Sequence, residues 1–192
     1  MTITHLKRAA RTPETGSAET RATVERMLAD IETRGEAAVM DYARELDNYE
    51  GEAVVSRERI EAAAAEVPER LKDDIRFALE RVRGFAEAQR GSVGEFEVEL
   101  SPGLWAGQKL IPVETAGAYV PGGRYAHVAS AIMSIATAKV AGVEHVVACS
   151  APRGPAGINP AILYTMDLCG ANTILSLGGV QAIAAMAFGH FT

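Results

Sequence analysis

The chain has 192 residues, of which 48% are hydrophobic and 23% charged, with a formal net charge of −6. This is the composition of a globular protein with room for one large or two small domains. The negative charge and the lack of a Lys/Arg run argue against nucleic acid as a partner, because nucleic-acid-binding domains usually carry a basic patch. No apolar stretch reaches the roughly 20 residues of a membrane helix, and residues 1–16 lack the apolar core of a signal peptide. We therefore expect a cytoplasmic protein with no membrane partner.

Residues 1–94 have the pattern of a helical region. Apolar residues recur at helical spacing in four stretches, which predicts four helices packed on a common core. Ser56 is a suitable cap for the third helix, and Pro68 can open the fourth. The four apolar stripes run over Val24–Ile31, Val39–Leu46, Ile60–Val67 and Leu71–Ala86, and they include Leu46 and Phe85.

Residues 95–113 change to the alternating pattern of strands. Phe96, Val98 and Leu100 alternate with polar residues, as in a half-buried strand. A Ser-Pro-Gly sequence at 101–103 favours a turn, and Leu104–Val113 reads as the returning strand. This stretch predicts a β-hairpin that links the two halves of the chain.

Residues 114–192 have an α/β pattern and hold only five charged residues after Glu114. Three short apolar strands alternate with three helices, which predicts a parallel sheet with helices on it. The expected strands are Gly117–Val120, His145–Cys149 and Thr173–Leu177, and the expected helices are Val128–Val140, Ala161–Cys169 and Val180–Phe188. We interpret this part as an incomplete Rossmann-like domain whose sheet continues outside the chain. We expect truncation to leave apolar surface bare, so that the isolated chain self-associates.

Two strand ends carry di-glycine turns. Pro121, Gly122 and Gly123 follow the first strand beside Tyr119, and Gly178 and Gly179 follow the third beside Gln181. Ligands of open parallel sheets bind at this edge, and glycines there let the backbone approach a phosphate at a helix N-terminus. The alternative is that these are only tight turns that require positive φ. The two turns together favour a nucleotide or cofactor site.

The remaining reactive residues identify no reaction. Cys149 and Cys169 lie in apolar segments without paired spacing, which predicts buried, reduced thiols. The histidines form no metal-binding pair at helical spacing, and no Ser/His/Asp arrangement is evident. The histidines are His5, His127, His145 and His190.

Several longer blocks resemble the histidinol dehydrogenase family, in the family's order. Tyr119–Gly123 reads YVPGG, and Gly178–Gly189 reads GGVQAIAAMAFG. Shorter blocks that fit are Arg34–Ala38, Phe85–Gln89, Ala138–Val143 and Leu168–Ala171. The resemblance extends over nearly the whole chain.

This resemblance implies an NAD-dependent, zinc-requiring dehydrogenase that oxidises a small polar alcohol to a carboxylic acid through an aldehyde. Family members are longer and form homodimers. Their NAD contacts include a tyrosine and a glutamine that match Tyr119 and Gln181. A further NAD contact, the zinc ligands and the Glu-His pair that shuttles protons are expected beyond residue 192. The resemblance therefore assigns no catalytic and no metal-binding residue to this chain.

The resemblance leaves the substrate open. Histidinol-oxidising members tend to run Tyr-Pro-Ser-Ser-Val-Leu-Met after the first di-glycine turn, whereas His127–Met133 keeps only Ser130 and Met133 of that pattern. The run looks more like that of relatives such as the sulfopropanediol dehydrogenases. L-histidinol and 2,3-dihydroxypropane-1-sulfonate are the two candidate substrates, and neutral drift in a packing helix is the alternative explanation. A non-catalytic binding or assembly module is the alternative to an enzyme.

Overall fold

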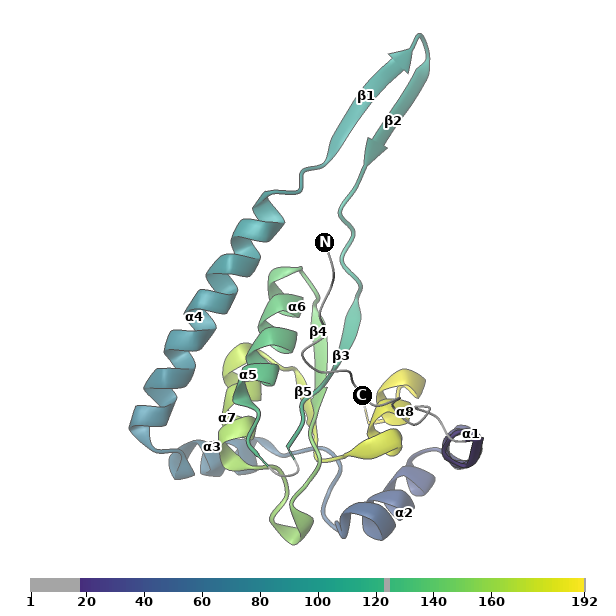
Figure 1. Cartoon of the computed structure of the whole chain (residues 1–192), viewed down its shortest axis with the longest axis vertical. Coiled ribbons are helices and arrows are strands. Elements are labelled where there is room, and N and C mark those ends of the chain that lie inside the picture. Colours follow the sequence, from purple (N-terminus) through teal and green to yellow (C-terminus); the bar gives the residue numbers. More distant parts are fainter. Residues whose placement is uncertain (1–17, 123–124, 192) are drawn as a thin grey trace, which may run out of the picture.

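The computed structural model describes residues 18–122 and 125–191, and Figure 1 shows their arrangement. A central sheet has helices on both sides, and a long hairpin projects from this body. Of the predicted site residues, Gly123 lies outside the described residues.

The four predicted N-terminal helices are confirmed. They are α1 (Ala18–Arg34), α2 (Glu36–Asp47), α3 (Arg57–Glu66) and α4 (Glu69–Gly91). The hydroxyl of Ser56 caps α3 by accepting a hydrogen bond of 3.3 Å from the backbone N–H of Arg59, and Pro68 directly precedes α4.

Two residues of the predicted stripes are not in the core. Phe85 is 67% exposed and Leu46 is 57% exposed. Each residue of a helix turns the side chain by about 100°, so Phe85 points well away from the buried face that Leu79 and Ala86 share. Leu46 lies in the last turn of α2, beyond Ala43, the last buried residue of that helix.

The predicted hairpin is confirmed, but the predicted half-burial of its first strand and the predicted length of its second strand were wrong. Strands β1 (Phe96–Ser101) and β2 (Leu104–Gln108) pair antiparallel, and every residue in them is exposed. The hairpin stands clear of the body in Figure 1, so neither face has a neighbour among the described residues. β2 ends at Gln108 rather than Val113, because Gln108 pairs with Phe96, where β1 begins.

Many of the exposed large apolar side chains lie on this hairpin and the segment after it, rather than on the sparsely charged half of the chain where they were expected. Residues of the hairpin and the following segment are more than two-fifths exposed despite being large and apolar: Phe96, Val98, Leu100, Leu104, Trp105, Leu110, Ile111 and Val113. The poorly charged second half, by contrast, buries most of its strands.

The predicted parallel sheet is confirmed. Its strands β3 (Thr115–Tyr119), β4 (His145–Cys149) and β5 (Thr173–Leu175) lie in the order β3-β4-β5. β5 is shorter than predicted, because the N–H of Ser176 donates to the carbonyl of Ala53 at 2.8 Å. Val54 forms an antiparallel bridge with Leu175. A segment of the helical region therefore covers the β5 edge.

The helices between the strands also match the prediction. α5 (Val128–Ala131), the π-helical η1 (Ile132–Ala136) and α6 (Thr137–Val140) form one helical run. The short 3-10 helix η2 (Gly154–Ala156) precedes α7 (Pro160–Cys169), and α8 (Gly179–Phe188) follows β5. Within the π segment the hydroxyl of Ser134 donates to the carbonyl of Ser130 at 2.7 Å.

Both faces of β4 and β5 are covered, which explains their mostly apolar residues. The edge strand β3, in contrast, leaves Thr115, Gly117 and Tyr119 exposed. Val146 and Ala148 of β4 face a core built with α3, α4, α7 and the 128–140 run. Val147 and Cys149 face the opposite core, built with α1, α2 and α8. The N-terminal helices thus pack directly on the sheet and position its carboxyl edge.

Both cysteines are buried, as predicted. Burial raises the pKa of the Cys149 thiol and of the Cys169 thiol to about 12. Among the described residues, no helix is long and apolar enough to cross a membrane.

Candidate functional site

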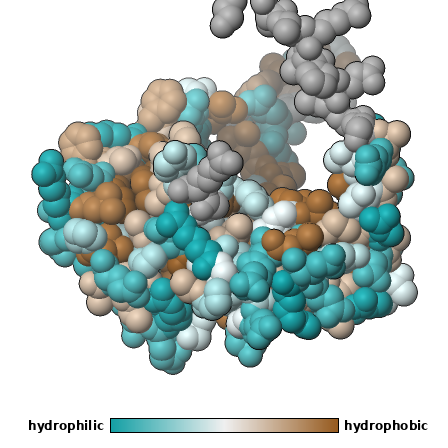
Figure 2. Space-filling view, turned by 60° about the horizontal axis from the view of Figure 1, so that its bottom comes forward, coloured by the Kyte–Doolittle hydropathy of each residue, from teal (hydrophilic) through white to brown (hydrophobic). Residues whose placement is uncertain are grey.

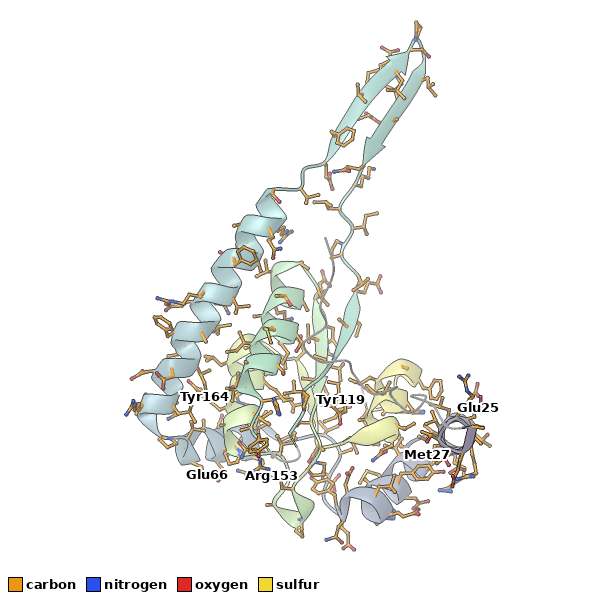
Figure 3. All side chains as sticks on the ribbon, in the orientation of Figure 1. Glu25, Met27, Glu66, Tyr119, Arg153 and Tyr164 are labelled. Atoms are coloured by element: carbon orange, nitrogen blue, oxygen red, sulfur yellow. The ribbon has the colours of Figure 1, made fainter. Side chains whose placement is uncertain are left out.

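The candidate site lies at the carboxyl ends of the parallel strands, where ligands of such sheets bind. Tyr119 ends β3 and is 37% exposed, and Figure 3 shows it close to the centre of the molecule. Figure 2 brings this end of the molecule forward and shows hydrophilic surface interrupted by hydrophobic patches. The edge is therefore a surface from which both polar and apolar groups can contact a ligand.

The structure brings Tyr119 to the second di-glycine turn. Its phenol oxygen accepts a hydrogen bond of 3.3 Å from the backbone N–H of Gly179. Gly179 is the first residue of α8, and the first N–H groups of a helix have no partner within it. The hydroxyl proton of Tyr119 is not used in this bond, so it can be donated to a ligand.

Gln181 is buried, with 1% of its surface exposed. Its Nε2 donates to Oδ2 of Asp47 at 2.9 Å. Its Oε1 is buried and has no hydrogen-bond partner among the described residues. A buried carbonyl oxygen without a partner costs free energy, so this oxygen is the clearest sign that a donor from outside these residues completes the site.

The glycines of the two turns are required for different reasons. Gly179 has a φ of +57°, and a Cβ there would lie 2.9 Å from Oε1 of Gln181. A Cβ on Gly178 would lie 2.7 Å from Cβ of Ala151, and one on Gly122 would lie 2.3 Å from Oγ of Ser150. Positive φ therefore explains Gly179, whereas close packing explains Gly178 and Gly122.

Asp47 is the site residue that sequence reasoning missed. It ends α2, and 134 positions separate it from Gln181. Burial raises the pKa of Asp47 above its usual value, while the hydrogen bonds from Gln181 and from the backbone of Gly178 partly oppose that rise. No local motif marks this aspartate, because its role depends on how α2 packs against the sheet.

Two serines and an arginine also follow the strands. Ser150 comes directly after β4 and Ser176 directly after β5, and both hydroxyls are buried without a partner among the described residues. Arg153 donates from Nε to the carbonyl of Gly122 at 3.3 Å. This contact ties the loop after β4 to the first di-glycine turn.

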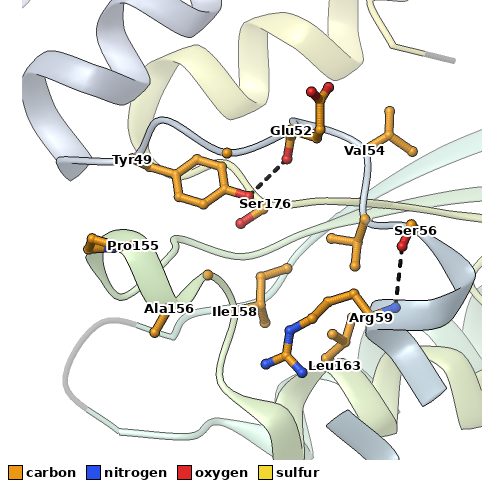
Figure 4. Close-up of a pocket in the computed structure, with 13 residues that line it drawn as sticks. Tyr49, Glu52, Val54, Ser56, Arg59, Pro155, Ala156, Ile158, Leu163 and Ser176 are labelled. Carbon is orange, nitrogen blue, oxygen red and sulfur yellow. Dashed lines mark hydrogen bonds between the residues drawn. The ribbon is translucent and has the colours of Figure 1, made fainter. Parts of the chain in front are cut away.

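A cavity of about 260 Å³ lies beside this edge, between the 49–59 segment and the loop that contains η2 (Figure 4). Tyr49 donates its hydroxyl to the carbonyl of Glu52 at 2.9 Å. Ser176 also lines the cavity, and Arg59 in its wall is paired with Glu66 at 2.8 Å. Among the described residues that line the cavity, Arg59 is the cation, and it is already paired with Glu66.

Among the described residues, His127 and His145 form no hydrogen bond with Tyr119 or Gln181. His127 is exposed and directly precedes α5, and Nε2 of His145 lies 3.4 Å from the hydroxyl of Thr173 inside the sheet. In the described ranges 18–122 and 125–191, no group of three or more His, Cys, Asp or Glu side chains could hold a metal ion. The described residues therefore do not fit a zinc centre.

The family model for histidinol dehydrogenase matches residues 10–192. The chain belongs to the histidinol dehydrogenase family. The sequence prediction of this family from the YVPGG and GGVQAIAAMAFG blocks is thereby confirmed.

Members of this family align along the whole chain. It is 53% identical over 191 residues to a sulfopropanediol 3-dehydrogenase from Ruegeria pomeroyi, covering 100% of this chain and 44% of that protein. It is 39% identical over 178 residues to a histidinol dehydrogenase from Methanosarcina mazei, covering 92% and 41%. The chain thus spans less than half the length of these relatives.

A solved structure gives the same fold. The crystal structure of histidinol dehydrogenase from Elizabethkingia anophelis matches with a TM-score of 0.86 and 30% identity, covering 94% of this chain and 41% of that one. The helical region, hairpin and parallel sheet are therefore those of the histidinol dehydrogenase family.

Proposed function

We propose that the protein is an NAD-dependent dehydrogenase that oxidises a small polar alcohol to a carboxylic acid through an aldehyde. Family membership and relatives named as dehydrogenases support this function. The observation that carries it is the meeting of Tyr119 and Gln181 at Gly179, where a buried carbonyl oxygen has no partner.

The residues present fit NAD. Tyr119 supplies a hydroxyl donor and Gln181 a carbonyl acceptor, and both lie beside the N-terminus of α8. A ribose hydroxyl or the nicotinamide carboxamide can satisfy such a pair, and the helix N-terminus favours the phosphates. When bound, NAD supplies the hydride acceptor, and the protein orients it against the substrate.

The glycines and the proline of the two turns form the walls of this site. A side chain at Gly122 or Gly178 would collide with the loop after β4, so the site keeps its shape only with glycine there. Exposed Pro121 adds a rigid wall. We propose the same role for Gly123, which lies outside the described residues.

Zinc is proposed as a second cofactor of the whole protein, with ligands outside this chain. The described residues of this chain offer no ligand set for it. We therefore derive no catalytic step through a metal from these residues. We also propose that the whole protein is a cytoplasmic homodimer that acts on a small polar alcohol.

We propose 2,3-dihydroxypropane-1-sulfonate, rather than L-histidinol, as the substrate. Identity is 53% to the sulfopropanediol 3-dehydrogenase and 39% to the histidinol dehydrogenase from Methanosarcina mazei. His127–Met133, which departs from the pattern of histidinol-oxidising members, begins the helical run after β3 at the candidate site. We propose that this stretch contributes to the choice of substrate.

Turnover by the full-length protein tests both proposals. Reduction of NAD is followed with each alcohol, and specificity constants are compared. We expect NADH formation with a strong preference for the sulfonate. A strong preference for L-histidinol would overturn the substrate proposal, and a protein without turnover on either alcohol that still binds NAD would favour the non-catalytic binding module.

A further inference from the structure

We propose that Asp47 is a positioning residue of the cofactor site, which holds the Gln181 amide so that its carbonyl oxygen faces the ligand. This role rests on the proposed function, since it assumes that the ligand is NAD. It adds to the site a residue from the helical N-terminal region.

The contact is specific because of its chemistry. A carboxylate only accepts hydrogen bonds, whereas an amide has a donating and an accepting end. Oδ2 of Asp47 lies 2.9 Å from Nε2 of Gln181, so the donating end of the amide is occupied. Oε1 is the end that remains, and it is the atom without a partner.

The orientation of this amide decides which ligand atoms it can bind. With Nε2 held by Asp47, Gln181 offers an acceptor, which suits the N–H of a carboxamide or the O–H of a ribose. A freely rotating amide would present its donor for part of the time and would bind such groups more weakly. Asp47 therefore sets the polarity of the site without touching the ligand itself.

Asp47 also contacts the turn that precedes Gln181. The backbone of Gly178 hydrogen-bonds to its carboxylate, and a Cβ on Gly178 would lie 3.2 Å from Oδ2. One carboxylate thus fixes both the turn and the amide at the start of α8. The positions of Gly179 and of the Tyr119 hydroxyl that it contacts depend on this turn.

Stability alone does not explain a carboxylate at this position. Among the described residues, no Lys, Arg or His lies within ion-pair distance of Asp47. Burying part of a carboxylate without a cation beside it costs desolvation free energy. The carboxylate is, however, a strong hydrogen-bond acceptor for Nε2 of Gln181.

The test measures NAD binding by calorimetry with the full-length protein and its Asp47→Ala, Asp47→Asn, Gln181→Ala and Asp47→Ala/Gln181→Ala variants. Glu45→Gln, an exposed position on α2, is the matched control. We expect Asp47→Ala to raise the dissociation constant about 5- to 100-fold, the range for losing one oriented hydrogen bond. Asp47→Asn should recover part of that loss, because its amide oxygen can accept from Nε2. The double variant should bind no more weakly than Gln181→Ala.

Three further measurements separate positioning from a structural defect. The KM for NAD should rise with Asp47→Ala while kcat at saturating NAD changes less than about twofold, and the thermal midpoint of Asp47→Asn should be no lower than that of Glu45→Gln. NAD affinity unchanged in Asp47→Ala but weakened in Gln181→Ala would overturn the role of Asp47 and leave the proposed function standing. Fully additive losses in the double variant would overturn it as well. A wild-type protein that does not bind NAD would overturn the proposed function itself.

Discussion

The phenol oxygen of Tyr119 accepts a hydrogen bond from the backbone N–H of Gly179, 60 positions away in the sequence. This bond joins the end of β3 to the start of α8 across the carboxyl edge of the sheet. It brings the two sequence blocks that identify the family into one site.

Tyr119→Phe removes the hydroxyl but keeps the ring. We expect the KM for NAD to rise about 5- to 100-fold, because one polar contact contributes about 1–3 kcal/mol when its partner would be left unpaired. Steady-state kinetics on the full-length protein measures this. Tyr164→Phe, on α7 near Lys72, is the control and should leave KM unchanged. Equal effects of the two variants would mean that the Tyr119 hydroxyl does not contact NAD.

Gly179→Ala should destabilise the protein by about 1–3 kcal/mol and weaken NAD binding. The new Cβ adds a collision with Oε1 of Gln181 to the cost of a positive φ. Gly189→Ala is a matched control, because its φ is +74° and its Cβ would meet open space. Urea denaturation of both variants isolates the cost of the collision. Equal free energies of unfolding for the two variants would contradict the close contact at Gly179.

Ser150→Ala should leave the free energy of unfolding unchanged or raise it by up to about 1 kcal/mol. The Ser150 hydroxyl is buried without a partner, so removing it relieves an unsatisfied polar group. Ser56→Ala, which removes the cap of α3, should instead cost about 1 kcal/mol. A loss at Ser150 as large as that at Ser56 would show that its hydroxyl has a partner, such as a bound water.

Asp47→Asn should change the pH dependence of stability. Because burial raises the folded-state pKa of Asp47 above its usual value, the stability linked to its protonated form is fully present below that usual value. It is lost as the pH rises through the folded-state pKa. Relative to wild type, the variant should therefore gain stability from pH 4 to pH 7. Denaturation midpoints at both values measure this, and a relative loss of stability over that range would contradict the raised pKa.

Local patterns in the sequence predict most of the elements. Helical spacing identifies α1 to α4, and the apolar strands separated by glycine turns identify β3, β4 and β5. These signals work because the period of apolar residues reflects which face of an element is buried. The same signals place Tyr119 and Gln181 at one edge, since the carboxyl ends of parallel strands lie together.

Contacts between distant segments could not be predicted in this way. Asp47 meets Gln181 only because α2 packs beside α8, and Ala53 pairs with Ser176 only because the chain after α2 runs along β5. For the hairpin, the sequence pattern predicted burial that the structure does not show. Its alternation predicts a buried face, yet Val98 and Leu100 lie exposed because no other described element packs against them.

The most direct test of the central claim is the dissociation constant of NAD for the full-length protein and its Gln181→Ala variant, with Gln89→Ala on the exposed end of α4 as control. The unpartnered Oε1 of Gln181 predicts that wild type and Gln89→Ala bind NAD equally well. Gln181→Ala should bind it about 5- to 100-fold more weakly. Equal affinity in all three proteins would contradict a cofactor site at the Gly179 turn.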